Sequence, residues 1–163
     1  MKRRFLKYIL YFLEAVFAFA LQATPYLLPE IFGEKAAALL PLAVSVSLLE
    51  EESNAVIFGA FCGLLADFAF SGSVGYFAIS FTIICFILSV LSGYIKISFL
   101  SELAAGCIAV LLILILYFVL YFAFSGYNGI MQFFLTHYIT RILYTLAFMP
   151  LFLLINKKLS GRK

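Results

Sequence analysis

Long apolar runs, separated by short polar or proline-containing segments, make up most of this chain. A helix needs about 20 mostly apolar residues to cross about 30 Å of hydrocarbon. The second run is short and contains Pro41, so we expect it to begin earlier, to lie tilted or to be sheltered by protein. The pattern predicts an all-α integral membrane protein, a compact bundle of about six transmembrane helices. These spans lie near residues 5–24, 36–49, 55–70, 76–95, 103–124 and 139–155.

The polar segments between the runs are too short to form a linker or a second domain. Residues 1–163 are therefore expected to form a single polytopic membrane domain. Residues 125–129 form a Ser/Gly-rich turn cluster, and the segment from there to His137 is expected to lie along the membrane interface.

The composition supports a membrane protein. The chain is 66% hydrophobic and 12% charged, whereas soluble domains are about half apolar and about a quarter charged. A soluble protein of this length buries only about 70% of its unfolded surface, which is too little to hide so many apolar side chains. Lipid must therefore be the solvent for most of the chain.

The basic residues cluster at the two ends of the chain. Cytoplasmic segments beside membrane spans retain an excess of Lys and Arg, so both termini are expected to be cytoplasmic, with an even number of spans between them. The net charge of +3 comes with no basic face, so no nucleic-acid partner is expected. The terminal basic residues are Lys2, Arg3, Arg4, Lys7, Lys157, Lys158, Arg162 and Lys163.

Neither a metal site nor a cofactor is expected. The cysteines, Cys62, Cys85 and Cys107, lie in apolar runs without CxxC spacing, which is typical of packing residues. The chain has a single His, so a His-based metal cluster cannot form. The N-terminus resembles a signal peptide, but Glu14 interrupts the apolar stretch and further spans follow, which favours a retained first helix.

Small residues and one aspartate recur at intervals of four in the third span. Ala55, Gly59, Gly63 and Asp67 share one helix face. Small residues at this spacing allow a neighbouring helix to approach closely. The face is expected to pack within the bundle, and the alternative is a surface for another protein.

Asp67 is followed at once by a Ser/Gly turn formed by Ser71, Gly72, Ser73 and Gly75. A carboxylate in the membrane is costly unless it is satisfied. The two hydroxyls of the turn and the unpaired N–H groups at the start of the fourth helix could satisfy it. We therefore predict that Asp67 fastens the turn between the third and fourth helices; a proton or ion role is the alternative.

Glu14 and Gln22 lie two helical turns apart on one side of the first span. A Glu in mid-membrane should be neutral, hydrogen-bonded to another helix or facing a wet cavity. Two interpretations stay open. The residues form a satisfied buried polar pair, or they line a cavity for a small ligand or for a partner's helix.

Two classes of intramembrane protease can be considered. An aspartyl protease needs two aspartates that share a proton, and this chain has only Asp67. A serine protease would pair Ser73 with His137, but a Ser-Gly turn is common loop chemistry. No enzyme is expected.

The stretch from Gly59 through Gly63 and Asp67 to Gly75 resembles the central signature of the MreD family of rod shape-determining proteins. That family shows two glycines four apart, an Asp four further on, and a small-residue turn that closes with Gly. Looser similarities lie in Leu21-Gln22 before Pro25, in Pro41, and in the closing span from Pro150. Glu14 and the run at residues 50–52 are not features of that pattern.

The resemblance implies a non-enzymatic scaffold in the bacterial cytoplasmic (inner) membrane. Such a protein associates with MreC and, through it, links the MreB filament to the polymerase and transpeptidase pair that synthesises lateral peptidoglycan. No cofactor is implied, and membrane lipid surrounds the bundle.

The family is also similar in fold to the substrate-binding S-components of energy-coupling-factor vitamin transporters, which supplies an alternative function. Those proteins tend to carry Ala-x-x-x-Ala on the first helix, and here no two of its alanines lie four apart. A ligand pocket would draw on the outer loops, where the candidates are Glu30, Glu34, Asn128 and Gln132.

Overall fold

The computed structural model describes residues 2–24, 35–69, 75–94, 98–123, 132 and 134–160, and these residues form helices without strands. Of two short π-helical segments, η1 continues α5 and η2 leads directly into α7. The elements are α1 (Lys2–Ala23), α2 (Leu39–Leu49), α3 (Glu52–Ala69), α4 (Tyr76–Tyr94), α5 (Phe99–Phe118), η1 (Val119–Ala123), η2 (Phe134–Tyr138) and α7 (Ile139–Ser160).

Five of the expected spans are present as helices long and apolar enough to cross a membrane. The last differs from its predicted bounds, because the helix continues from Phe134 to Ser160 through η2 and covers 27 residues. The described end of the expected interfacial segment, Phe134 to His137, is therefore helical and belongs to this span, which corrects the expectation for these residues; the rest of that segment, apart from Gln132, lies outside the described residues.

The expected span at residues 36–49 needs correction. Its helix, α2, has only 11 residues and covers about 16 Å, half of the hydrocarbon thickness. Every residue of α2 is buried, and all five longer helices contact it. The protein therefore shelters it from lipid, one of the options left open by the sequence. Pro41 lies in the first turn, where its missing N–H leaves no helical hydrogen bond unmade.

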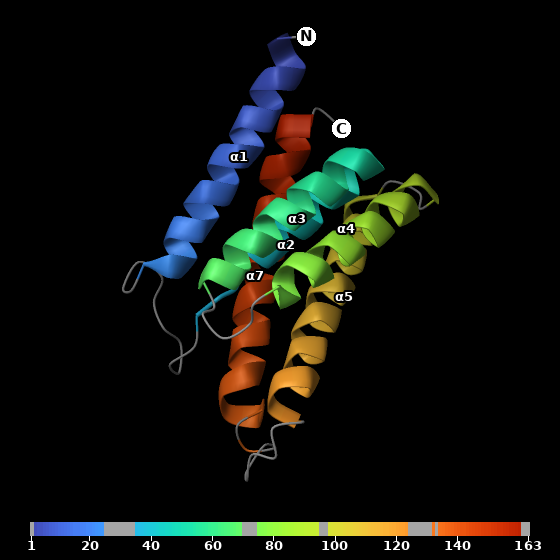
Figure 1. Cartoon of the computed structure of the whole chain (residues 1–163). Coiled ribbons are helices and arrows are strands. Elements are labelled where there is room, and N and C mark those ends of the chain that lie inside the picture. Colours follow the sequence, from blue (N-terminus) through green and yellow to red (C-terminus); the bar gives the residue numbers. More distant parts are fainter. Residues whose placement is uncertain are drawn as a thin grey trace.

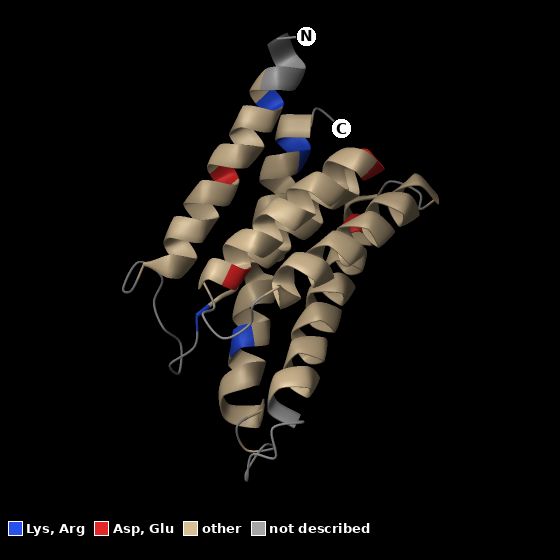
Figure 2. Ribbon diagram, in the orientation of Figure 1, with Lys and Arg blue, Asp and Glu red and all other residues tan. Residues whose placement is uncertain are grey.

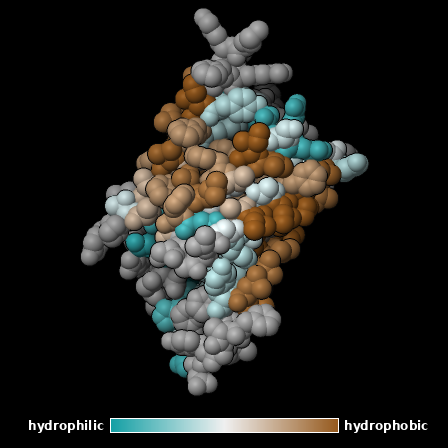
Figure 3. Space-filling view, viewed as in Figure 1, coloured by the Kyte–Doolittle hydropathy of each residue, from teal (hydrophilic) through white to brown (hydrophobic). Residues whose placement is uncertain are grey.

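Both termini lie at the same end of the bundle (Figure 1). An even number of passes, expected from the basic ends of the chain, requires the termini to lie on one side in this way. The described residues supply five helices long enough to cross a membrane and the short α2. Charged residues lie mainly toward the helix ends, apart from an acidic position partway along α1 and a basic position inside the long helix that ends in α7 (Figure 2). Apolar side chains cover the middle of the visible face, and hydrophilic ones lie toward its ends (Figure 3). This distribution fits a protein surrounded by lipid.

Candidate functional site

Asp67 joins the end of α3 to the beginning of α4. The backbone N–H of Phe77 donates a hydrogen bond to Asp67 Oδ1, and the N–H of Ala78 donates one to Asp67 Oδ2, each at 3.0 Å. These N–H groups lack helical acceptors, and the positive end of the α4 dipole favours the carboxylate. The contact predicted from the sequence is thus present, although Asp67 lies at the unfavourable end of its own helix.

Gly75 completes this junction. Its φ of +84° lies in the left-handed region, which glycine adopts without steric cost. Its carbonyl then accepts the N–H of Ile79 at 3.1 Å, in the first turn of α4. The other predicted members of the turn, Ser71, Gly72 and Ser73, lie outside the described residues.

Gly59 and Gly63 hold α3 directly against α4. A Cβ at Gly59 would lie 2.8 Å from the Cβ and Sγ atoms of Cys85. A Cβ at Gly63 would lie 2.5 Å from the carbonyl oxygen of Phe77 and 2.6 Å from the Cα of Ala78. Both glycines are buried. The small-residue face is thus packed within the bundle, as expected, and is not free for another protein.

Glu14 and Gln22 do not form a satisfied pair in the described part of the chain. Gln22 is buried, and its Oε1 accepts the N–H of Leu39 at 3.4 Å, at the start of α2. Among the described residues, Gln22 Nε2 and Glu14 Oε2 are buried without a hydrogen-bond partner. Gln22 therefore helps to position α2.

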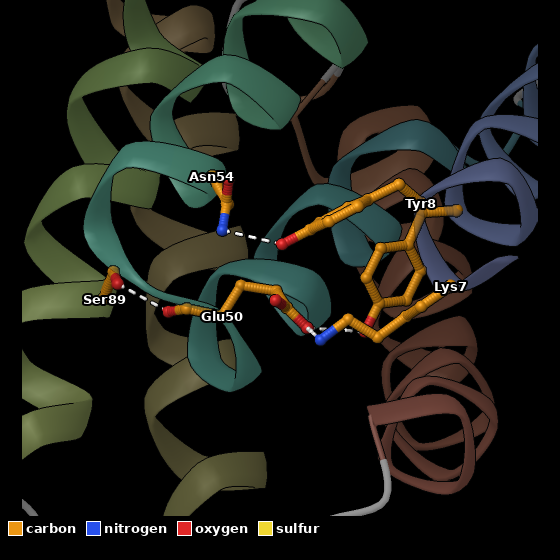
Figure 4. Close-up of polar contacts among 6 residues, drawn as sticks. Lys7, Tyr8, Glu50, Asn54 and Ser89 are labelled. Atoms are coloured by element: carbon orange, nitrogen blue, oxygen red, sulfur yellow. Dashed lines mark hydrogen bonds and ion pairs between the residues drawn. The ribbon is translucent and has the colours of Figure 1, made fainter. Parts of the chain in front are cut away.

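A cluster around Glu50 was not predicted. Its carboxylate Oε1 lies 2.6 Å from the Lys7 ammonium and accepts the hydroxyl of Tyr11 at 2.9 Å (Figure 4). Its backbone carbonyl accepts the hydroxyl of Ser89 at 2.8 Å. Nearby, the Asn54 amide donates to the Tyr8 hydroxyl at 2.9 Å. Glu50 is buried, so the cation and the hydrogen bonds offset the desolvation of its charge.

The sequence carried a partial signal for this cluster. Glu50 directly follows the apolar run at residues 36–49, and Lys7 is the last residue of the N-terminal basic group, at the start of the first span. Each of these charged residues stands close to one end of a predicted membrane span. Nothing in the linear pattern pairs them, because the contact joins α1 to the end of α2 across the bundle.

A second buried ion pair joins α5 to α7. The Lys157 ammonium lies 3.0 Å from Oε2 of Glu102 and 5.8 Å from the centre of the Phe99 ring. Glu102 is buried. The linear pattern indicates only a topology signal at Lys157, so its ion pair with Glu102 was not predicted.

Polar side chains of the surrounding helices also hold α2 and the residues before it. Asn156 Nδ2 donates to the Ser45 hydroxyl at 2.7 Å, and Thr145 Oγ1 accepts the N–H of Ala37 at 3.1 Å. Cys85 Sγ lies 3.7 Å from the carbonyl oxygen of Ala43. With Gln22 and the Glu50 cluster, these contacts fix both ends of a helix too short to span the membrane alone.

The described carboxylates of Asp67, Glu50 and Glu102 each contact a different neighbouring helix. Among the described residues, no three His, Cys, Asp or Glu side chains are grouped to hold a metal. The pairing of Ser73 with His137 cannot be placed, because Ser73 lies outside the described residues. Of the outer-loop candidates, Glu30, Glu34 and Asn128 also lie outside them, and Gln132 is exposed.

Comparison with protein families matches residues 2–159 to the family described as rod shape-determining protein MreD. The match takes in all of the described helices except the final residue of α7. No curated protein matched the chain. No solved structure matched it either, so the likeness to the S-component fold stays a prediction.

Proposed function

Because the chain belongs to the MreD family of rod shape-determining proteins, we propose that it is a non-enzymatic scaffold of the bacterial cell-elongation machinery. The observation that carries this proposal is the family match over residues 2–159. In this proposal the protein supports rod shape and lateral peptidoglycan synthesis by holding other components together in the cytoplasmic membrane.

The contacts of the acidic side chains support a scaffold. Asp67, Glu50 and Glu102 each bind a neighbouring helix rather than converging on one site. Catalytic acids and bases need a shared reacting centre within hydrogen-bond reach. Dispersed carboxylates that each fasten two helices instead give a rigid bundle, which suits a protein that presents fixed surfaces to partners.

In the finer proposal, the direct partner is MreC, and the MreB filament and the polymerase and transpeptidase pair are reached through it. Both termini would lie in the cytoplasm, in line with the basic residues at the two ends of the chain. The described helices leave large apolar side chains on the outer surface, among them Ile57, Phe68 and Leu100. Such surfaces can contact lipid or the transmembrane helix of a partner.

The first test is purification of the tagged full chain from native membranes in mild detergent, with co-purifying proteins identified by mass spectrometry. A tagged multi-pass membrane protein of similar abundance is the control for non-specific capture. We expect MreC and the elongation synthase to be enriched only with the chain. Enrichment of a transporter ATPase module instead would favour the S-component function and contradict the scaffold.

A genetic test addresses the function itself. Depletion of the chain should turn rod-shaped cells round, and re-expression of the natural sequence should restore them. Cells that stay rod-shaped after depletion would contradict a requirement for the chain in elongation.

A further inference from the structure

An apolar groove opens between α1 and α3, next to the Glu50 cluster. It has a volume of about 380 Å³ and is lined mainly by Tyr8, Tyr11, Phe12, Ile57, Phe58 and Phe61. Asn54 and Phe61 lie seven residues apart on α3, so the groove extends about 10 Å along that helix, from its N-terminal turn toward the middle of the span.

A polar hollow adjoins the groove at the helix ends. Its volume is about 630 Å³, and its lining includes Lys7, Glu51, Glu52 and Ser92. Tyr8, Glu50 and Asn54 line both spaces, so the groove and the hollow adjoin along these three residues. The polar part lies where α2 ends and α3 begins, and the apolar part runs toward mid-membrane. A bilayer lipid has the same order of headgroup and acyl chain.

We propose that the groove and the hollow together bind one phospholipid whose zwitterionic headgroup carries a primary ammonium, the chemistry of phosphatidylethanolamine. One acyl chain lies in the groove between α1 and α3, and the headgroup lies in the hollow. The site does not depend on the scaffold function, because it rests on the shape and charge of this region alone.

The lining favours a lipid chain over the helix of a partner protein. Membrane helices that associate closely present small residues such as Gly and Ala at their contact. In this protein the small residues Gly59 and Gly63 already face α4. The groove is walled by large aromatic side chains, which keep another helix at a distance but leave room for a flexible, narrow acyl chain.

The charge of the hollow selects the headgroup. Lys7 and Glu50 form a pair that is neutral overall, so Glu51 and Glu52 give the lining a net negative charge. Both are exposed at the mouth of the hollow. They repel an anionic headgroup and attract an ammonium, and only an ammonium with N–H groups can also donate hydrogen bonds to them. The amide of Asn54 and the ammonium of Lys7 lie within the same hollow as donors for the phosphate.

Native mass spectrometry of the full chain tests the headgroup. The purified protein is equilibrated with mixed micelles that hold equal amounts of phosphatidylethanolamine, phosphatidylcholine and phosphatidylglycerol. We expect about tenfold more retained phosphatidylethanolamine than either other lipid. Retention of phosphatidylglycerol equal to or above that of phosphatidylethanolamine would overturn the proposal, as would retention of no lipid. This comparison uses the natural sequence and needs no variant to fold.

A pair of matched variants tests the groove. Ile57→Trp fills it from α3, whereas Leu64→Trp adds the same bulk to an exposed position of the same helix outside the lining. We expect Ile57→Trp to reduce phosphatidylethanolamine retention about tenfold and Leu64→Trp to leave it unchanged. Unchanged retention in Ile57→Trp, or an equal loss in both variants, would place the lipid elsewhere.

The double variant Glu51→Gln/Glu52→Gln tests the hollow. Removing both charges should abolish the preference for phosphatidylethanolamine over phosphatidylglycerol while an acyl chain still occupies the groove. A preference that persists unchanged would contradict the assigned role of these carboxylates.

Discussion

The N–H of Phe77 donates a hydrogen bond of 3.0 Å to the carboxylate of Asp67, so the last turn of α3 is fastened to the first turn of α4. The neighbouring N–H of Ala78 donates a hydrogen bond to the second carboxylate oxygen at the same distance. One side chain thereby satisfies two N–H groups that the helix itself leaves open. Together with the close contacts of Gly59 and Gly63, this junction holds α3 against α4.

Replacing Asp67 with Ala should destabilise the protein by about 1–3 kcal/mol, because two charge-assisted hydrogen bonds are lost. Asp67→Asn keeps one acceptor oxygen and should give a smaller loss. Unfolding of the purified variants in mixed micelles measures both. Phe68→Ala, at a neighbouring exposed position, is the matched control and should change stability by less than about 0.5 kcal/mol. Equal stability of Asp67→Ala and the natural chain would show that the junction is held by packing alone.

Gly63→Ala should destabilise the protein by about 1–3 kcal/mol, because the added methyl group would collide with the backbone of α4 at Phe77 and Ala78. Gly93→Ala is the control, since a methyl group there meets nothing within 4 Å. Ala is the better helix former, so Gly93→Ala should be neutral or stabilising by up to about 1 kcal/mol. Equal free energies of unfolding for Gly63→Ala and Gly93→Ala would contradict the prediction.

Lys7→Met should destabilise the protein by about 3 kcal/mol, because the buried Glu50 carboxylate then lacks its cation. Glu50→Gln keeps an oxygen that can accept the Tyr11 hydroxyl and should cost less. The double variant Lys7→Met/Glu50→Gln should lose clearly less unfolding free energy than the two single variants lose in sum. A double-mutant cycle in the unfolding assay measures this coupling, and strict additivity would rule out an energetic link between the residues.

Reporter fusions should place both termini in the cytoplasm. A fluorescent protein joined to either end should fluoresce, and alkaline phosphatase joined to either end should be inactive, because the basic ends resist translocation. Alkaline phosphatase joined after Thr24, one residue beyond the end of α1, should instead be active. Opposite reports from the two termini would mean that α2 and the residues before it do not complete a pass.

The junction at Asp67 could be predicted from the sequence because it is local. Its partners lie 10 and 11 residues away, and the rules for helix ends already say which groups need an acceptor. The glycine spacing likewise indicates a close helix contact, and the structure assigns that contact to α4. The partners of Glu50 and Glu102 could not be predicted, since Tyr11 and Lys157 lie 39 and 55 residues away from them.

The sequence by itself determined that this is a helical membrane protein, where most of its helices lie, and which aspartate fastens two of them. These features depend on the length of apolar runs and on neighbours within a few turns. Only the tertiary structure decided that α2 is a short buried helix rather than a full span. The reason is physical: lipid and protein interior are equally apolar, so hydrophobicity alone cannot tell which of the two surrounds a helix.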